Sequence, residues 1–144
     1  MREQRLPTKD QDKIFPEQQT IKSIRDLKVY KLAYRLAMEV FEIAKGFPKE
    51  ETYSLTDQIR RSSRSVASNI REGYAKRRYQ HVFTKHLNDA FGSSEETRTW
   101  LEFSHDCGYL SSEQRVCLDR GYDEVSAMLY TLMEKWETFD GSES

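Results

Sequence analysis

The sequence has little of what defines several large classes of protein. Its two cysteines, Cys107 and Cys117, are too few for a disulfide framework. Its three prolines and six glycines are too few for a turn-rich all-β domain. No run of about 18–20 apolar residues is present, which excludes a membrane-spanning helix. The N-terminus has no apolar stretch of the secretory type, so we expect a cytoplasmic protein with reduced thiols.

The usual motifs of catalytic and cofactor sites are also missing. No glycine-rich loop follows a strand pattern, which excludes the phosphate-binding loop of nucleotide hydrolases. His81 and His86 are five residues apart, whereas ligand pairs on a helix are three or four apart. Residues 104–107 are Ser, His, Asp and Cys, but consecutive helical residues point in different directions. We therefore expect no enzyme, no metal and no cofactor; an enzyme centred on His105 and Cys107 is the alternative.

What is present indicates one helical domain of 144 residues, in which 8 tyrosines, 7 phenylalanines and 2 tryptophans supply core side chains. Residues 1–22 lack periodicity and are expected to form a flexible arm, and residues 140–144 a flexible tail. Four helical patterns occupy the bundle region 23–139, at about 26–45, 54–76, 79–105 and from 111 onward. Four helices with short connections predict an all-α, antiparallel up-down-up-down four-helix bundle.

The first helix has two apolar stripes, although a surface helix needs only one. The first stripe consists of Leu27, Tyr30, Tyr34, Ala37, Met38, Phe41 and Ala44. The second stripe consists of Val29, Leu32, Ala33, Leu36, Val40 and Ile43. One stripe can face the bundle and the other a second subunit, so we predict a homo-oligomer. The candidate interface residues are Val29, Leu32, Leu36, Val40 and Ile43.

Local signals predict the helix ends. Ser54 with Asp57, and Ser111 with Gln114, have the spacing of a capping box. Gly108 is placed to end the third helix. Gly92 lies in the middle of that helix, where a glycine costs about 1 kcal/mol relative to alanine. We therefore predict that a neighbouring helix approaches closely at Gly92.

Charge is divided unevenly along a chain whose net charge is only −1. Residues 79–140 carry twelve acidic and five basic side chains, whereas residues 60–78 carry seven basic side chains against Glu72 alone. The seven are Arg60, Arg61, Arg64, Arg71, Lys76, Arg77 and Arg78.

Helical spacing places Arg60, Arg64, Arg71 and Arg78 on one face. Tyr74 and Tyr79 lie between the charges, a combination typical of RNA or DNA contact. The alternative is that these arginines pair with the acidic third and fourth helices.

The run from Asn69 to Gly73 allows two interpretations. Asn69 falls near the inward line of its helix, and Glu72 is within one turn of it. With Arg71 they can form a buried polar network that fixes the register of the bundle. Alternatively, the three side chains form a site. The lack of a histidine or metal pattern around them favours the structural role.

Residues 58–73 (QIRRSSRSVASNIREG) and residues 90–96 (AFGSSEE) resemble the signature of the four-helix 23S rRNA-intervening-sequence proteins. The resemblance implies an antiparallel four-helix protomer, commonly assembled as a ring-like homopentamer. A related branch, the accessory variability determinants of diversity-generating retroelements, binds a reverse transcriptase and nucleic acid.

By position, the resemblance implies polyanion contact through Arg60, Arg61, Arg64 and Arg71. It also implies a set of bundle-defining positions, which are Gln58, Asn69, Glu72, Gly73, Gly92, Ser93 and Glu96. We therefore predict a non-enzymatic, self-associating scaffold or binding protein that contacts RNA or DNA through residues 60–78. The alternative is an accessory protein that docks a reverse transcriptase or another protein.

Overall fold

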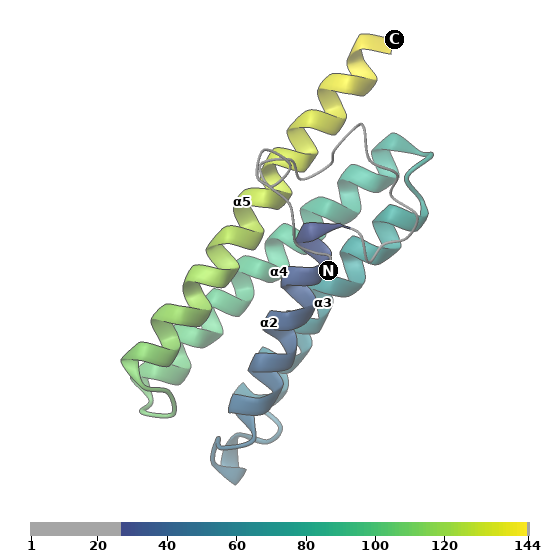
Figure 1. The fold of residues 1–144 in the computed structure, drawn as a ribbon. Coiled ribbons are helices and arrows are strands. Elements are labelled where there is room, and N and C mark those ends of the chain that lie inside the picture. The colour runs from purple at the N-terminus through teal and green to yellow at the C-terminus, as the bar shows by residue number, and fades with distance from the viewer. Residues whose placement is uncertain (1–26, 144) are drawn as a thin grey trace, which may run out of the picture.

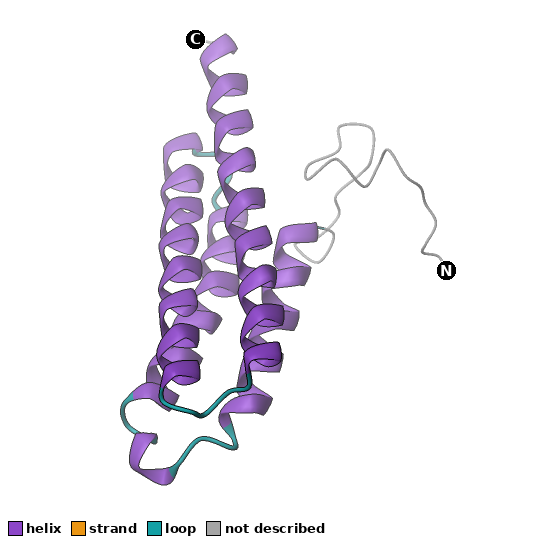
Figure 2. Ribbon diagram, turned by 90° about the vertical axis from the view of Figure 1, so that its left-hand side faces the viewer, coloured by secondary structure: helices purple, strands orange, loops and turns teal. Residues whose placement is uncertain are grey.

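The computed structural model describes residues 27–143, and their side chains as far as Trp136. This part of the chain contains four α-helices, a short 3-10 helix and no strand (Figure 2). The elements are α2 (Lys28–Ala44), η2 (Lys49–Glu51), α3 (Leu55–Ala75), α4 (Gln80–Asp106) and α5 (Ser112–Glu143). The predicted all-α class with four helices is thus confirmed. The arm predicted for residues 1–22 lies outside the described residues.

The helix α5 differs from the prediction at its C-terminal end. It continues to Glu143, so the tail predicted for residues 140–144 is helical as far as that residue. With 32 residues it is nearly twice as long as α2, which has 17. Its C-terminal end extends beyond the other helices (Figure 1). Near that end, the Trp136 ring packs edge-on against Phe83 of α4, with the ring centroids 4.6 Å apart.

Each helix packs against two others. The helix α3 lies between α2 and α4, and α5 contacts both α4 and α2 (Figure 1). Hydrogen bonds across the α3–α4 contact show its register. Thr97 bonds to Ser62 near the start of α3, and His86 bonds to Asn69 near its end. Later residues of α4 therefore lie beside earlier residues of α3.

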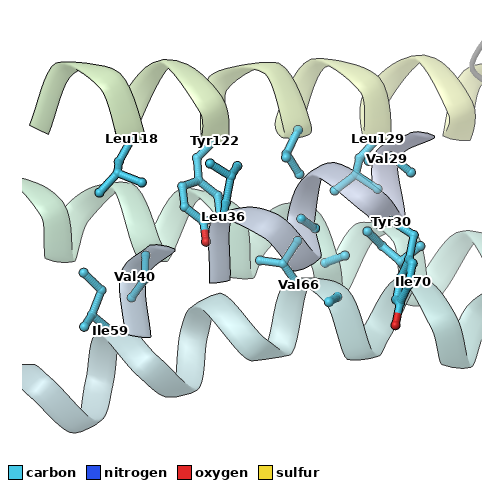
Figure 3. Close-up of a cluster of buried hydrophobic side chains, with 14 of the residues drawn as sticks. Val29, Tyr30, Leu36, Val40, Ile59, Val66, Ile70, Leu118, Tyr122 and Leu129 are labelled. Carbon is cyan, nitrogen blue, oxygen red and sulfur yellow. The ribbon is translucent and has the colours of Figure 1, made fainter. Parts of the chain in front are cut away.

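The core lies where the four helices meet, and it corrects the predicted oligomer interface. Val29, Leu36 and Val40 are at most 2% exposed within a single chain, while Leu32 and Ile43 are partly buried against the same core. Figure 3 shows Leu36 beside Tyr122 of α5. Since one chain already covers Val29, Leu36 and Val40, these three side chains belong to the protomer core, and their assignment to a subunit interface is wrong.

The opposite stripe of α2 is the one left open to solvent. Tyr34 and Met38 are 47% and 48% exposed, and Ala37 and Phe41 are partly buried. Only the ends of this stripe are covered, as at Tyr30, which is 5% exposed. An apolar helix face exposed in its middle is available for contact with another molecule.

The predicted helix ends are correct around the α4–α5 turn. Gly108 has a φ of +86°, and the Tyr109 N–H donates to the Ser104 carbonyl (2.8 Å), which forms a Schellman motif. Ser111 and Gln114 form the reciprocal capping box, with both hydrogen bonds at 3.0 Å.

The cap predicted at the start of α3 is wrong. The Ser54 hydroxyl donates to the carboxylate of Glu51 (2.6 Å) and makes no cap hydrogen bond. Glu51 itself accepts the N–H of Leu55 at 3.2 Å. The carboxylate of Glu51, at the end of η2, therefore caps the first turn of α3, a role that the sequence pattern assigned to Ser54.

The close helix contact predicted at Gly92 is also wrong. A Cβ atom at that position would meet nothing within 4 Å among the described residues. The close approaches occur instead at two other helical glycines. At Gly73 a Cβ would lie 2.7 Å from the Cβ of His86, and at Gly121 it would lie 2.7 Å from Cδ2 of Leu36. These glycines let α4 and α2 pack tightly against α3 and α5.

Candidate nucleic-acid interface

The seven predicted basic residues fall into two groups. Arg60, Arg61, Arg64 and Arg71 lie on α3. The other three, Lys76, Arg77 and Arg78, follow the last helical residue, Ala75. Because the helix ends first, Arg78 is not part of the shared helical face, and that part of the prediction is wrong.

Three arginines of α3 lie along the aromatic side chains of α2, and we call Arg60, Arg64 and Arg71 the arginine face. Arg60 Nη2 donates to the Phe41 carbonyl oxygen (3.0 Å), and its guanidinium lies 4.6 Å from the centre of the Phe41 ring. The Arg64 guanidinium is 5.9 Å from the same ring. At these distances each cation is attracted by the π-system.

The third member of the arginine face lies beside the first turn of α2. Arg71 Nη1 donates to the Tyr30 hydroxyl (3.4 Å), and its guanidinium is 6.0 Å from the centre of the Tyr30 ring. A guanidinium carries five N–H donors. The contacts with α2 therefore position Arg60 and Arg71. Exposed Arg71 keeps most of its donors available, whereas Arg60 is half-buried and its Nε is buried without a hydrogen-bond partner among the described residues.

The predicted interleaving of aromatic and basic side chains is present around the C-terminal end of α3. The Arg77 guanidinium lies 3.9 Å from the centre of the Tyr74 ring, and that of Arg78 lies 5.6 Å from the Tyr79 ring. Tyr79 is 60% exposed. The first pair joins the last turn of α3 to the segment that follows it, and the second pair lies beyond the end of α3.

Two of the seven basic residues pair with a carboxylate on their own helix or next to it. Lys76 Nζ is 3.0 Å from Glu72, and Arg61 Nε is 3.9 Å from Asp57. Within the described part of the chain, none of the other five forms an ion pair. The alternative that α4 and α5 neutralise these arginines is therefore wrong.

Several acidic residues of α4 and α5 are paired with cations of the same two helices. Arg98 is hydrogen-bonded to Asp119 (2.9 Å), Asp123 (3.1 Å) and Glu95 (3.2 Å). The hydrogen bond with Asp119 is the main cause of a raised pKa for the Arg98 guanidinium. Arg115 approaches Glu102 at 3.7 Å. These carboxylates are therefore paired within α4 and α5 and make no ion pair with the arginine face.

A groove of about 440 Å³ runs between α2 and α3, beside the arginine face. From α2 it is lined by Tyr30, Tyr34, Ala37, Met38 and Phe41, and from α3 by Arg64, Ala67, Ser68 and Arg71. Its α2 side is therefore largely aromatic, and its α3 side carries two small side chains between two arginines. Sequence reasoning missed this groove because it placed the second stripe of α2, rather than the first, on the outside of the protomer at a subunit interface.

The predicted inward network contains only one of its three members. Asn69 Oδ1 lies 3.1 Å from His86 Nδ1, and Asn69 Nδ2 donates to the Ser65 carbonyl (3.0 Å). Arg71 and Glu72 are exposed, and a hydrogen bond from Lys76 is the main cause of a lowered pKa for the Glu72 carboxyl. The polar pair that joins α3 to α4 is therefore Asn69 with His86, which the sequence pattern did not indicate.

Several positions of the predicted signature line a second, more polar groove between α3 and α4. It has a volume of about 520 Å³, and Gln58, Ser93 and Glu96 contribute to it together with Arg61 and Arg64. The Ser93 hydroxyl donates to the Ser65 hydroxyl across the two helices (2.9 Å). These three signature residues thus lie where α3 meets α4.

The polar run at the end of α4 forms a different arrangement from the one its sequence suggested. His105 lies between the Asp106 carboxylate (3.0 Å from Nδ1) and the Ser112 hydroxyl (3.0 Å from Nε2). Asp106 and Ser112 are exposed. Ser104 instead donates to the Trp100 carbonyl, and Cys107 is a free, exposed thiol.

A metal-binding cluster and a membrane-spanning helix are both absent from the described residues. Residues 27–143 contain no group of three or more His, Cys, Asp or Glu side chains placed to hold a metal ion. None of the helices in this part of the chain combines the length and the apolar character needed to cross a bilayer.

The fold and the arginine face define an all-α protein of four long helices with a basic surface on α3. The model of a family described as 23S rRNA-intervening sequence protein matches residues 25–131. The chain belongs to this family, as its signature stretches predicted.

One solved structure supports the family and the fold. It is the crystal structure of a protein of unknown function from the S23 ribosomal protein family of Bacteroides thetaiotaomicron. It superposes with a TM-score of 0.68 at 25% sequence identity, covering 74% of this chain and 95% of the other. No curated protein matches this sequence.

Proposed function

We propose that this chain is a non-enzymatic, self-associating four-helix protein that binds RNA through the arginine face. One observation carries the proposal: Arg60, Arg64 and Arg71 make no ion pair within the described residues, whereas Arg98 on α4 has three carboxylate partners. Unpaired guanidiniums held beside aromatic rings are suited to phosphate contact.

Self-association into a ring of up-down-up-down protomers is the second part of the proposal. The contacts between α3 and α4 support antiparallel neighbours, since late residues of one helix lie beside early residues of the next. Phe103 and Val116, which are 53% and 44% exposed, provide apolar surface near the α4–α5 turn. Light scattering after size exclusion should give the mass of five chains, and Phe103→Glu with Val116→Glu should give monomers. A monomeric native protein would contradict this part.

RNA binding is tested by a salt series with a structured RNA and with a single-stranded RNA. Each neutralised phosphate contributes about −0.7 to −0.9 to the slope of log affinity against log salt. We expect the triple variant Arg60→Glu, Arg64→Glu, Arg71→Glu to lose at least about 100-fold in affinity and about two units of slope. The matched control is Lys85→Glu, Arg120→Glu, Lys135→Glu, which changes the total charge equally on the other helices.

The two triple variants separate a specific surface from a general charge effect. Equal losses in both variants would contradict the assignment to the arginine face. If the native protein bound no RNA even at low salt, the RNA proposal would be wrong. The same face would then be assigned to a protein ligand such as a reverse transcriptase.

A further inference from the structure

The groove between α2 and α3 adds a second kind of contact to the proposed RNA site. We infer that this groove receives an unpaired base of the bound RNA, while the neighbouring arginines hold the adjoining phosphates. The inference rests on the proposed function and deepens it, because it names single-stranded nucleotides as the preferred ligand.

The shape of the groove fits a flat heterocycle. Its volume of about 440 Å³ lies within the range of about 300–1,000 Å³ that is common for small-ligand sites. The lining positions of α2 extend from Tyr30 to Phe41, a length of about 16 Å at 1.5 Å per residue. On the α3 side, Ala67 and Ser68 contribute no bulky side chain. A base entering from solvent would therefore contact aromatic side chains on the α2 side and small groups on the α3 side.

The exposed ring of Tyr34 is the main stacking surface. It is 47% exposed, and it lies 6.0 Å from the buried Tyr30 ring with an interplanar angle of 44°. Tyr30 thus supports Tyr34 from within the fold, and Tyr34 presents its remaining surface outward. Every nucleobase has a π-face, so stacking on such a ring does not depend on sequence.

The charges beside the groove favour a nucleotide over other occupants. Arg64 and Arg71 line the groove, and neither has a carboxylate partner within the described residues. A purely apolar segment of another protein would cover Tyr34 and Met38 but would desolvate these two cations without a counter-charge. A nucleotide supplies a planar apolar face and an anionic phosphate together.

A second copy of this chain is a weaker fit for the same reason. It would have to bring carboxylates to the groove, and several carboxylates of α4 and α5 are already held by Arg98. A duplex is also excluded as the main ligand of the groove, because its bases are already stacked and paired. The observations therefore favour single-stranded RNA.

The test uses the full chain and a short single-stranded RNA that carries one 2-aminopurine, whose fluorescence is quenched by stacking. Tyr34→Ala should lower affinity for this RNA by about tenfold and abolish the quenching. Tyr34→Phe keeps the ring and should bind at least about fivefold more tightly than Tyr34→Ala. The control is Tyr53→Ala, which removes a tyrosine that is 95% exposed outside the groove. Affinity for a duplex of the same sequence should not change with Tyr34→Ala.

Three outcomes would overturn the inference. The first is equal affinity and equal quenching for the native protein and Tyr34→Ala, while the arginine triple variant still loses binding. The second is an equal loss of duplex affinity. The third is a change in the mass of the assembly on Tyr34→Ala with no change in RNA affinity per protomer, which would give the groove to a second copy. In each of these outcomes the proposed arginine contacts stand, so the two proposals fail separately.

Discussion

The α2–α3 side of the molecule and the α4–α5 side differ in how their polar side chains are paired. Between α4 and α5, Ser94 is hydrogen-bonded to Ser126 (2.8 Å), Ser126 donates to Glu95 (2.7 Å), and Glu95 accepts from Arg98 (3.2 Å). Along α2 and α3, Arg64 and Arg71 lie beside aromatic side chains and a hydroxyl and make no ion pair among the described residues. The α4–α5 side therefore uses charges to hold two helices together, whereas these two arginines of the α2–α3 side are not neutralised by a described carboxylate.

The largest expected effect tests which face of α2 belongs to the core. Leu36→Glu places a charge against α5 at a side chain that is 2% exposed, and we expect a loss of at least about 3 kcal/mol or complete unfolding. Met38→Glu makes the same kind of change on the exposed face and should cost no more than about 0.5 kcal/mol. Urea unfolding followed by circular dichroism measures both. A folded, monomeric Leu36→Glu protein would restore the subunit interface that the structure contradicts.

The next largest effects are expected from replacing one arginine on each side, Arg98 on the α4–α5 side and Arg64 on the α2–α3 side. Arg98→Ala removes the partner of Asp119, Asp123 and Glu95 and should lower stability by about 1–3 kcal/mol. Arg64→Ala should change stability by less than about 0.5 kcal/mol, yet reduce the salt slope of RNA binding by about 0.7–0.9. Denaturant unfolding and binding titrations on the same two variants give the answer. If Arg64→Ala lowered stability and Arg98→Ala reduced the salt slope of RNA binding, the proposed difference between the two sides would be wrong.

A smaller effect on stability is expected at the helix N-termini, where the cap of α5 can be compared with that of α3. Ser111→Ala removes a cap hydrogen bond to the Gln114 N–H and should cost about 1 kcal/mol. Ser54→Ala removes only a hydroxyl contact with the exposed Glu51 carboxylate and should cost a few tenths of that. Thermal unfolding of the two variants tests the difference. Equal costs would mean that Ser54 caps α3 after all.

Much of this fold is predictable from sequence because its signals are local. The cap at Ser111 and the turn at Gly108 depend on residues within one helical turn of each other, and both predictions are correct. The cap at Ser54 fails because Glu51, in the preceding turn, takes both the hydroxyl and the Leu55 N–H. The capping-box pattern starts at Ser54 and covers only the residues after it, so it does not include Glu51.

The orientation of α2 was not predictable in the same way. Both stripes are apolar, so hydropathy alone does not decide which one faces inward. The decision depends on Gly121, far along the chain on α5, whose missing side chain leaves space for Leu36. The candidate site was therefore only partly predictable from sequence. The charge count identifies the arginines, whereas the groove beside them depends on how α2 packs.

The smallest expected effect concerns pH and the carboxylate that caps α3. Hydrogen bonds from the hydroxyls of Ser54 and Tyr109 and from the Leu55 N–H lower the pKa of Glu51, and the same pairing raises the pKa of Tyr109 to about 12.

A group whose pKa is lowered by folding stabilises the native state above its unfolded pKa, about 4.3 for glutamate, and loses that contribution as the pH falls through the folded value. Glu51→Gln should therefore weaken the decline in stability below about pH 4, whereas Glu50→Gln, one residue away, should leave that decline close to native. Urea midpoints measured between about pH 3 and pH 6 provide the test, and parallel curves for native and Glu51→Gln proteins would show that the carboxylate cap does not contribute.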